Sequence, residues 1–121
     1  MLKENDFRRI ALGMTAAIEA AHMGHPDFRV HGRIFASLHH DPQTAGRGPI
    51  AGMIVLTPAQ QRQFMQDHPA AFTPESGAWG RSGCTRVQLD AVDEDVLGDA
   101  MTLAWHIPVV AAVVEHEGRI V

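Results

Sequence analysis

The chain has 121 residues, of which 45% are apolar and 20% charged, a composition typical of a globular protein rather than a disordered or fibrous one. Its single cysteine excludes an internal disulfide, and no apolar run approaches the roughly 20 residues that a membrane-spanning helix needs. The first residues are charged where a signal peptide would be apolar, so we expect one cytoplasmic domain over residues 1–121 with no membrane partner.

Charge is distributed unevenly along the chain. The net charge is −4, which taken alone argues against a nucleic-acid partner. Residues 29–86, however, carry six arginines and no lysine against three acids, a balance of +3, whereas residues 87–121 carry one arginine against seven acids, a balance of −6. The basic middle predicts either a face that meets an anion or charges scattered over solvated surface.

The first expected element is an amphipathic helix from Asn5 to His22, because apolar residues recur there at three- and four-residue spacing. Asn5 or Asp6 can cap its start with a side-chain oxygen. Gly24 and Pro26 are expected to end it, since the glycine tolerates a left-handed turn and the proline cannot continue a helix.

Three short strands are expected next, at Asp27–His31, Arg33–Leu38 and Ala51–Thr57. Gly32 separates the first two, which brings Arg29 near Arg33 only if the connection is a tight hairpin. Residues 39–49, rich in glycine and proline, are expected to form a loop. Alternation in the second strand predicts one face made of Ile34, Ala36 and Leu38, opposite Arg33, Phe35 and Ser37.

The second half opens with a capping-box pattern at Thr57, Pro58 and Gln60, which predicts a helix from Pro58 to Asp67. Two strands are expected after it, Ala70–Thr73 and Cys84–Leu89, joined by a loop rich in proline, serine and glycine. One more helix is expected at Asp93–Trp105. The buried stripe of this last helix is predicted to be Val96, Leu97, Ala100, Met101 and Ala104. Residues 108–121 fit a strand or a helix equally well.

These elements predict an α+β fold of the order α-β-β-β-α-β-β-α. Neighbouring strands joined by short turns favour an antiparallel sheet. A sheet of this kind needs helices on one face to bury its apolar side, so we expect two layers with the helices packed on one face.

Several stretches, taken in order, resemble the MmcQ/YjbR family. They are Phe28-Arg-Val-His-Gly-Arg-Ile-Phe-Ala, a strand followed by Thr57-Pro58 and a helix, Phe72-Thr-Pro…Gly77-Ala-Trp79-Gly80-Arg81, and Val92-Asp-Glu-Asp, over about residues 28–105. The resemblance implies a fold similar to the bacterial frataxin-like CyaY arrangement and a double-wing motif that binds DNA. The chain departs from the family at Ser82-Gly83-Cys84, where members commonly carry a basic and an aromatic residue. Such groups contact phosphates and stack on bases.

The Trp79-Gly80-Arg81 segment allows two interpretations. The indole and guanidinium can hold a planar or anionic ligand. Alternatively, Trp79 folds back to cap the core at the sheet edge, with Gly80 allowing the turn. Together with Trp79, the residues that we expect to form an anion-binding face are Arg29, Arg33, Arg81 and Arg86.

The remaining reactive side chains are expected to be structural or solvated. His22 and His25 lie three residues apart and His39-His40-Asp41 forms a compact cluster, but neither pattern supplies several converging metal ligands. Cys84 begins a predicted strand with no helix terminus beside it to activate the thiol. We therefore expect no metal and no cofactor.

We predict a binding domain rather than an enzyme, with nucleic acid as the partner that the family resemblance implies. The alternative is a protein that binds or sequesters a small planar or anionic ligand beside Trp79. A second alternative is an enzyme that uses histidines or Cys84. The sequence does not indicate the oligomeric state.

Overall fold

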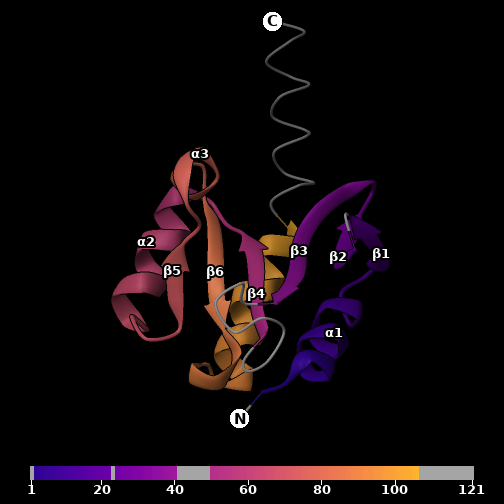
Figure 1. Ribbon diagram of the computed structural model, residues 1–121, viewed down its shortest axis with the longest axis horizontal. Helices are drawn as coiled ribbons and strands as arrows, with labels where there is room; N and C mark the ends of the chain where they lie inside the picture. The colour runs from indigo at the N-terminus through magenta and orange to yellow at the C-terminus, as the bar shows by residue number, and fades with distance from the viewer. Residues whose placement is uncertain (1, 23, 41–49, 107–121) are drawn as a thin grey trace, which may run out of the picture.

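The protein is built around a six-stranded antiparallel sheet with the strand order β1-β2-β3-β4-β6-β5 (Figure 1). A computed structural model describes residues 2–22, 24–40 and 50–106. The strands are β1 (Ile18–His22), β2 (His25–Val30), β3 (Arg33–His40), β4 (Ile50–Val55), β5 (Phe72–Pro74) and β6 (Cys84–Gln88). The helices are α1 (Glu4–Leu12), α2 (Pro58–Asp67), α3 (Gly77–Arg81), a 3₁₀ turn (Leu89–Ala91) and a helix over residues 94–106.

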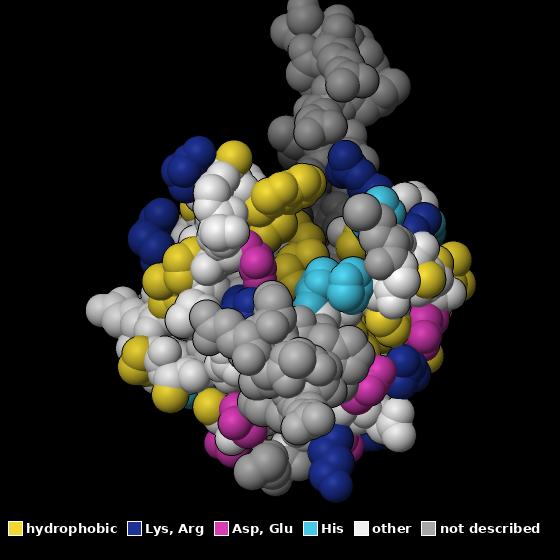
Figure 2. Space-filling model, in the orientation of Figure 1, with side chains coloured by type: hydrophobic (Ala, Val, Ile, Leu, Met, Phe, Trp, Pro, Cys, Tyr) yellow, Lys and Arg dark blue, Asp and Glu magenta, His cyan; other side chains and the backbone are white. Residues whose placement is uncertain are grey.

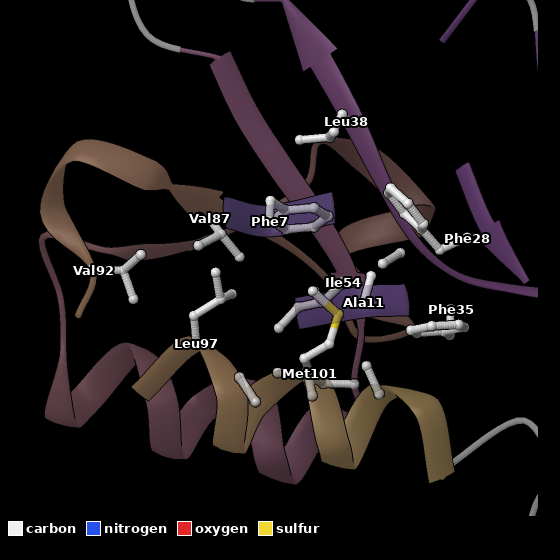
Figure 3. Close-up of a cluster of buried hydrophobic side chains, with 14 of the residues drawn as sticks. Phe7, Ala11, Phe28, Phe35, Leu38, Ile54, Val87, Val92, Leu97 and Met101 are labelled. Carbon is white, nitrogen blue, oxygen red and sulfur yellow. The ribbon is translucent and has the colours of Figure 1, made fainter. Parts of the chain in front are cut away.

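Helices α1, α2 and the 94–106 helix lie on one face of the sheet (Figures 1 and 3). None of these three covers the opposite face, and the short helix α3 lies at the end of β5 and β6 (Figure 1). This arrangement confirms the predicted α+β fold, the antiparallel sheet and the helices packed on one face. The predicted element order is approximately right, since the structure adds a strand, β1, and the helix α3.

The core fills the space between the sheet and the helices. Phe7 and Ala11 reach it from α1, and Leu97, Ala100, Met101 and Ala104 form the predicted stripe of the 94–106 helix (Figure 3). The rings of Phe7 and Phe28 lie 5.9 Å apart, tilted against each other. Gly52 on β4 allows this packing, because a Cβ there would overlap the Phe7 ring. Full burial of each such phenylalanine contributes about 1.5–3 kcal/mol to folding.

The first predicted helix is too long. Helix α1 ends at Leu12, and Ile18–His22 forms β1, which pairs with β2 through a turn at Gly24. Ala16 has a positive φ of 63°, so the chain leaves the helical conformation before β1 begins. Apolar spacing misled the prediction, because Ile18 is 59% exposed on this edge strand and does not contact the core as a helical stripe would.

A β-bulge in β3 corrects the predicted faces of that strand. Phe28 pairs with Ala36 and Arg29 with Ile34, so Phe35 is an extra residue in β3. Phe35 and Ala36 are therefore both buried in the core, whereas Ile34 turns to the opposite face. Simple alternation placed Ile34 with Ala36 and Phe35 opposite them, which is wrong, because a bulge interrupts the two-residue period.

The boundaries of α2 are as predicted. The Thr57 hydroxyl accepts a hydrogen bond from the Gln60 backbone N–H at 3.1 Å, and the Gln60 side chain accepts one from the Thr57 N–H at 3.1 Å. Pro58 occupies the first turn, where its missing N–H costs nothing.

Other boundaries need correction. The strand expected at Ala70–Thr73 is Phe72–Pro74, and the loop after it contains α3. β3 extends through His39 and His40, which were assigned to a loop. The rest of that loop, 41–49, and the tail, 108–121, lie outside the described residues. No helix among those described is both long and apolar enough to cross a bilayer.

Candidate functional site

The face of the sheet opposite the three helices carries a pocket of about 490 Å³. Figure 2 looks onto this hollow, with apolar side chains at its bottom and histidines along one rim. Its apolar lining comes mainly from Ile34, Met53, Val55, Cys84 and Trp79. A concave, largely apolar surface with a few polar groups is the usual form of a small-molecule site.

The sheet register positions the pocket floor. Asp27 pairs with Ser37, Ser37 with Met53, and Met53 with Arg86, so one row of side chains crosses β2, β3, β4 and β6. Residues directly opposite in antiparallel strands project from the same face of the sheet. The β3 bulge adds Ile34 to this face, so the packing irregularity also shapes the pocket.

Three histidines, His22, His25 and His39, line one part of the pocket. His22 and His25 are cross-strand partners in the β1–β2 hairpin, and the rings of His25 and His39 are 4.9 Å apart. The Ser37 hydroxyl and Nε2 of His39 are hydrogen-bonded at 2.6 Å. Burial and the neighbouring His25 lower the pKa of His39, with a smaller opposing effect from Glu75.

Asp27 is a buried carboxylate at the pocket wall, only 1% exposed. Arg29 donates to both of its oxygens, from Nε at 2.8 Å and from Nη2 at 3.0 Å. Such a two-point pair compensates the charge of a buried carboxylate and fixes its orientation. Arg29 is thereby engaged within the protein.

Trp79 lies on the pocket wall in α3 and is 73% exposed. It is therefore not a cap on the core, and that structural interpretation is wrong. The next residue, Gly80, has no room for a side chain. A Cβ at this position would overlap the carbonyl oxygen of Glu75. The glycine thus allows this close approach.

Gln61, buried under α3, fixes this segment to the sheet. Its side-chain amide donates to the carbonyl oxygens of Gly80 and Cys84, both at 3.0 Å. Helix α2, the start of β6 and the segment that carries Trp79 are thereby joined by one side chain. The pocket wall is consequently held by a buried contact rather than by a surface loop alone.

Cys84 lines the pocket but is not poised as a nucleophile. Burial, followed by the nearby Glu75 charge, raises the pKa of its thiol. A thiol held protonated is a weak nucleophile. Across residues 2–22, 24–40 and 50–106, moreover, no group of three or more His, Cys, Asp or Glu side chains is arranged to hold a metal ion.

The five predicted binding residues do not all gather at the pocket. Trp79 lines it, Arg86 projects from the same sheet face, and Arg29 is paired with Asp27. Arg33, at the start of β3, and Arg81, at the end of α3, are both exposed. Basic side chains in Figure 2 are spread around the hollow rather than joined in one strip. Their role in binding stays a prediction.

The polar wall of the pocket, formed by Ser37, His25 and His39, is not predicted from the sequence. One signal was available: the Gly24 turn sits between His22 and His25, which a hairpin makes cross-strand partners. A helix over this segment does not make the two histidines cross-strand partners, so the predicted helix hides that signal. A loop at His39 likewise gives it no fixed neighbours.

Comparisons with known proteins agree with this fold. The YjbR family profile matches residues 12–107. The crystal structure of Deinococcus radiodurans protein DR2400, which contains a DUF419 domain, superposes with a TM-score of 0.67 at 18% identity, covering 87% of this chain and 77% of that one. At that identity the likeness concerns the fold. A search of curated proteins found no similar sequence. Since the profile spans most of its length, the chain belongs to the YjbR family.

Proposed function

We propose that this protein binds a small, planar, largely apolar molecule in the pocket on the open face of its sheet. The observation that carries the proposal is a pocket of about 490 Å³ whose wall includes a tryptophan that is 73% exposed. Exposing an indole to water forgoes its burial energy, and a planar ligand stacked on it would recover part of that energy.

The chemistry of the lining supports this ligand class. Ile34, Met53 and Val55 offer apolar contact, and methionine adapts its shape to an irregular guest. Polar groups lie at the polar wall and also, just before α3, at Glu75 and Ser76, and they can orient a ligand. The volume falls within the range of about 300–1,000 Å³ that is usual for small-molecule sites.

Nucleic-acid binding, which the family resemblance suggested, has less support. Arg29 is already engaged by Asp27, and the net charge of the chain is −4. Backbone binding to DNA depends on several cations acting together. A duplex titrated at low salt should therefore bind weakly, and tight binding that falls steeply with salt would favour the nucleic-acid function instead.

Tryptophan fluorescence tests the proposal directly. We expect 4-nitrobenzamide, a planar neutral quencher, to give saturable quenching in the wild type that is lost in Trp79→Phe. Collisional quenching of an exposed indole would be linear in quencher concentration, so saturation distinguishes binding from encounter. Linear quenching in both proteins would contradict the proposal.

A pair of added phenylalanines serves as the matched control. Val55→Phe adds bulk to the pocket, whereas Ala59→Phe adds it to an exposed position of α2. Saturable quenching should weaken markedly in the first variant and persist in the second. Equal effects of the two variants would place the probe elsewhere on the molecule.

A further inference from the structure

We propose that the ligand of this pocket carries an acidic group, which binds as an anion at the wall formed by His25, Ser37 and His39 while the planar part lies against Trp79. This inference rests on the proposed function and specifies its ligand class. Two of its residues, His25 and His39, are expected from the sequence to be structural or solvated.

The geometry of the wall places two hydrogen-bond donors within a small area. The His25 and His39 rings are 4.9 Å apart, and the Ser37 hydroxyl lies 2.6 Å from Nε2 of His39. The hydrogen bond between Ser37 and His39 uses one of the two donors that a hydroxyl and a neutral imidazole have between them, so one donor of this pair and the N–H of His25 are left for a carboxylate. Ser37 is buried and its partner fixes its position, so these donors are preorganised.

Charged and titratable groups surround this wall on β1, β2 and β6 and just before α3. Asp27, on β2, is neutralised by Arg29. His22 faces the pocket from β1, and Arg86 lies on the same sheet face, on β6. Glu75, just before α3, is the remaining acid in the lining, and Cys84 is held as a neutral thiol.

The pKa of His39 is lowered, and burial rather than a neighbouring charge is the largest cause. Burial lowers its pKa first, the neighbouring His25 acts in the same direction, Glu75 opposes them, and Arg86 again lowers it. The protonated, cationic form of His39 is thus disfavoured. A bound anion would offset this penalty, so binding an acid should favour protonation of His39, and affinity should rise as pH falls.

A matched pair of probes separates the acidic group from the planar body. 4-Nitrobenzoate and 4-nitrobenzamide have nearly the same shape, and the first is an anion at the pH values used. We expect the benzoate to bind about tenfold more tightly than the amide at about pH 6, because hydrogen bonds to a charged group are stronger than neutral ones. The preference should shrink as pH rises to about 8.

Histidine variants locate the preference. His25→Gln and His39→Gln keep a hydrogen-bonding side chain that cannot become cationic, so each should reduce the benzoate preference to about threefold or less while the affinity for the amide is retained. Retained amide affinity also shows that the pocket is still folded. His31→Asn, at the exposed β2–β3 turn, is the control and should keep the full preference.

The outcomes distinguish this inference from the proposed function. If the two probes bind equally at every pH, the acidic-ligand proposal is overturned and the pocket proposal stands. If neither probe quenches saturably, both are overturned. If the benzoate preference survives in both glutamine variants, the anion binds away from the histidine wall and the assignment of residues is wrong.

Discussion

Replacing Gln61 by methionine should destabilise the protein by about 2 kcal/mol. Its amide donates to the carbonyl oxygens of Gly80 and Cys84. Each carbonyl keeps a second partner, because Gly83 N–H donates to Gly80 O and Glu75 N–H to Cys84 O. The substitution therefore costs two net hydrogen bonds of about 1 kcal/mol each, rather than the larger penalty of two orphaned buried groups. Methionine has a similar length, so little cavity is created.

Urea denaturation followed by far-ultraviolet circular dichroism measures this change in the free energy of unfolding. Gln66→Met, at an exposed position of the same helix, is the matched control and should stay within about 0.5 kcal/mol of the wild type. Gln61→Glu should be worse than Gln61→Met at neutral pH, because it directs a carboxylate at two carbonyl oxygens. Equal stability of Gln61→Met and Gln66→Met would refute the role assigned to Gln61.

Four further substitutions test other parts of the structure. Gly80→Ala should lower the free energy of unfolding by at least about 2 kcal/mol, because its Cβ would overlap the Glu75 carbonyl. Gly98→Ala, which has open space around it in the 94–106 helix, should raise the free energy of unfolding by about 0.5–1 kcal/mol, and urea denaturation measures both changes. His31→Asn should raise the melting temperature, because His31 and Gly32 both have positive φ and Asn-Gly is favoured there; a lower value would contradict that turn assignment. The lowered pKa of His39 means that the unfolded chain takes up this proton first as pH falls. The contribution of neutral His39 to stability is therefore complete above about pH 6.5 and declines below it. His39→Gln should lessen the loss of stability that is measured between about pH 7 and about pH 5.

The regular elements with local signals were predictable from the sequence. The Thr57–Gln60 capping box defines α2 through interactions of residues three apart, so its start needs no knowledge of the rest of the fold. The stripe of the 94–106 helix follows from its spacing in the same way. The YjbR resemblance rested on the order of several motifs and is confirmed by the family match over residues 12–107.

Features decided by tertiary contact were not predictable in this way. The spacing of apolar residues over Ile18–His22 fits a helix, yet pairing with β2 makes this segment an edge strand. The β3 bulge depends on how Phe35 packs beneath the sheet, and it decides which side chains reach the pocket. No local signal marks either event.

The candidate site also contains residues that stand out in the sequence and residues that only the fold brings together. Trp79 could be singled out from the sequence, because an aromatic residue in a Gly-rich segment stands out, and it lies on the pocket wall; its role in binding stays a prediction. The wall of His25, Ser37 and His39 was missed, because its members become neighbours only through strand register. The arginines drew attention by their number, but Arg29 serves a buried aspartate.

Backbone amide chemical shifts can map a bound planar compound onto the protein residue by residue. On addition of 4-nitrobenzamide, the largest changes should cluster at Ser37, Met53, Cys84 and Trp79, from β3, β4, β6 and α3. Amides of α1 and the 94–106 helix, on the other face of the sheet, should change little. Changes concentrated on the helical face, or none at saturating probe, would contradict a ligand site in the pocket.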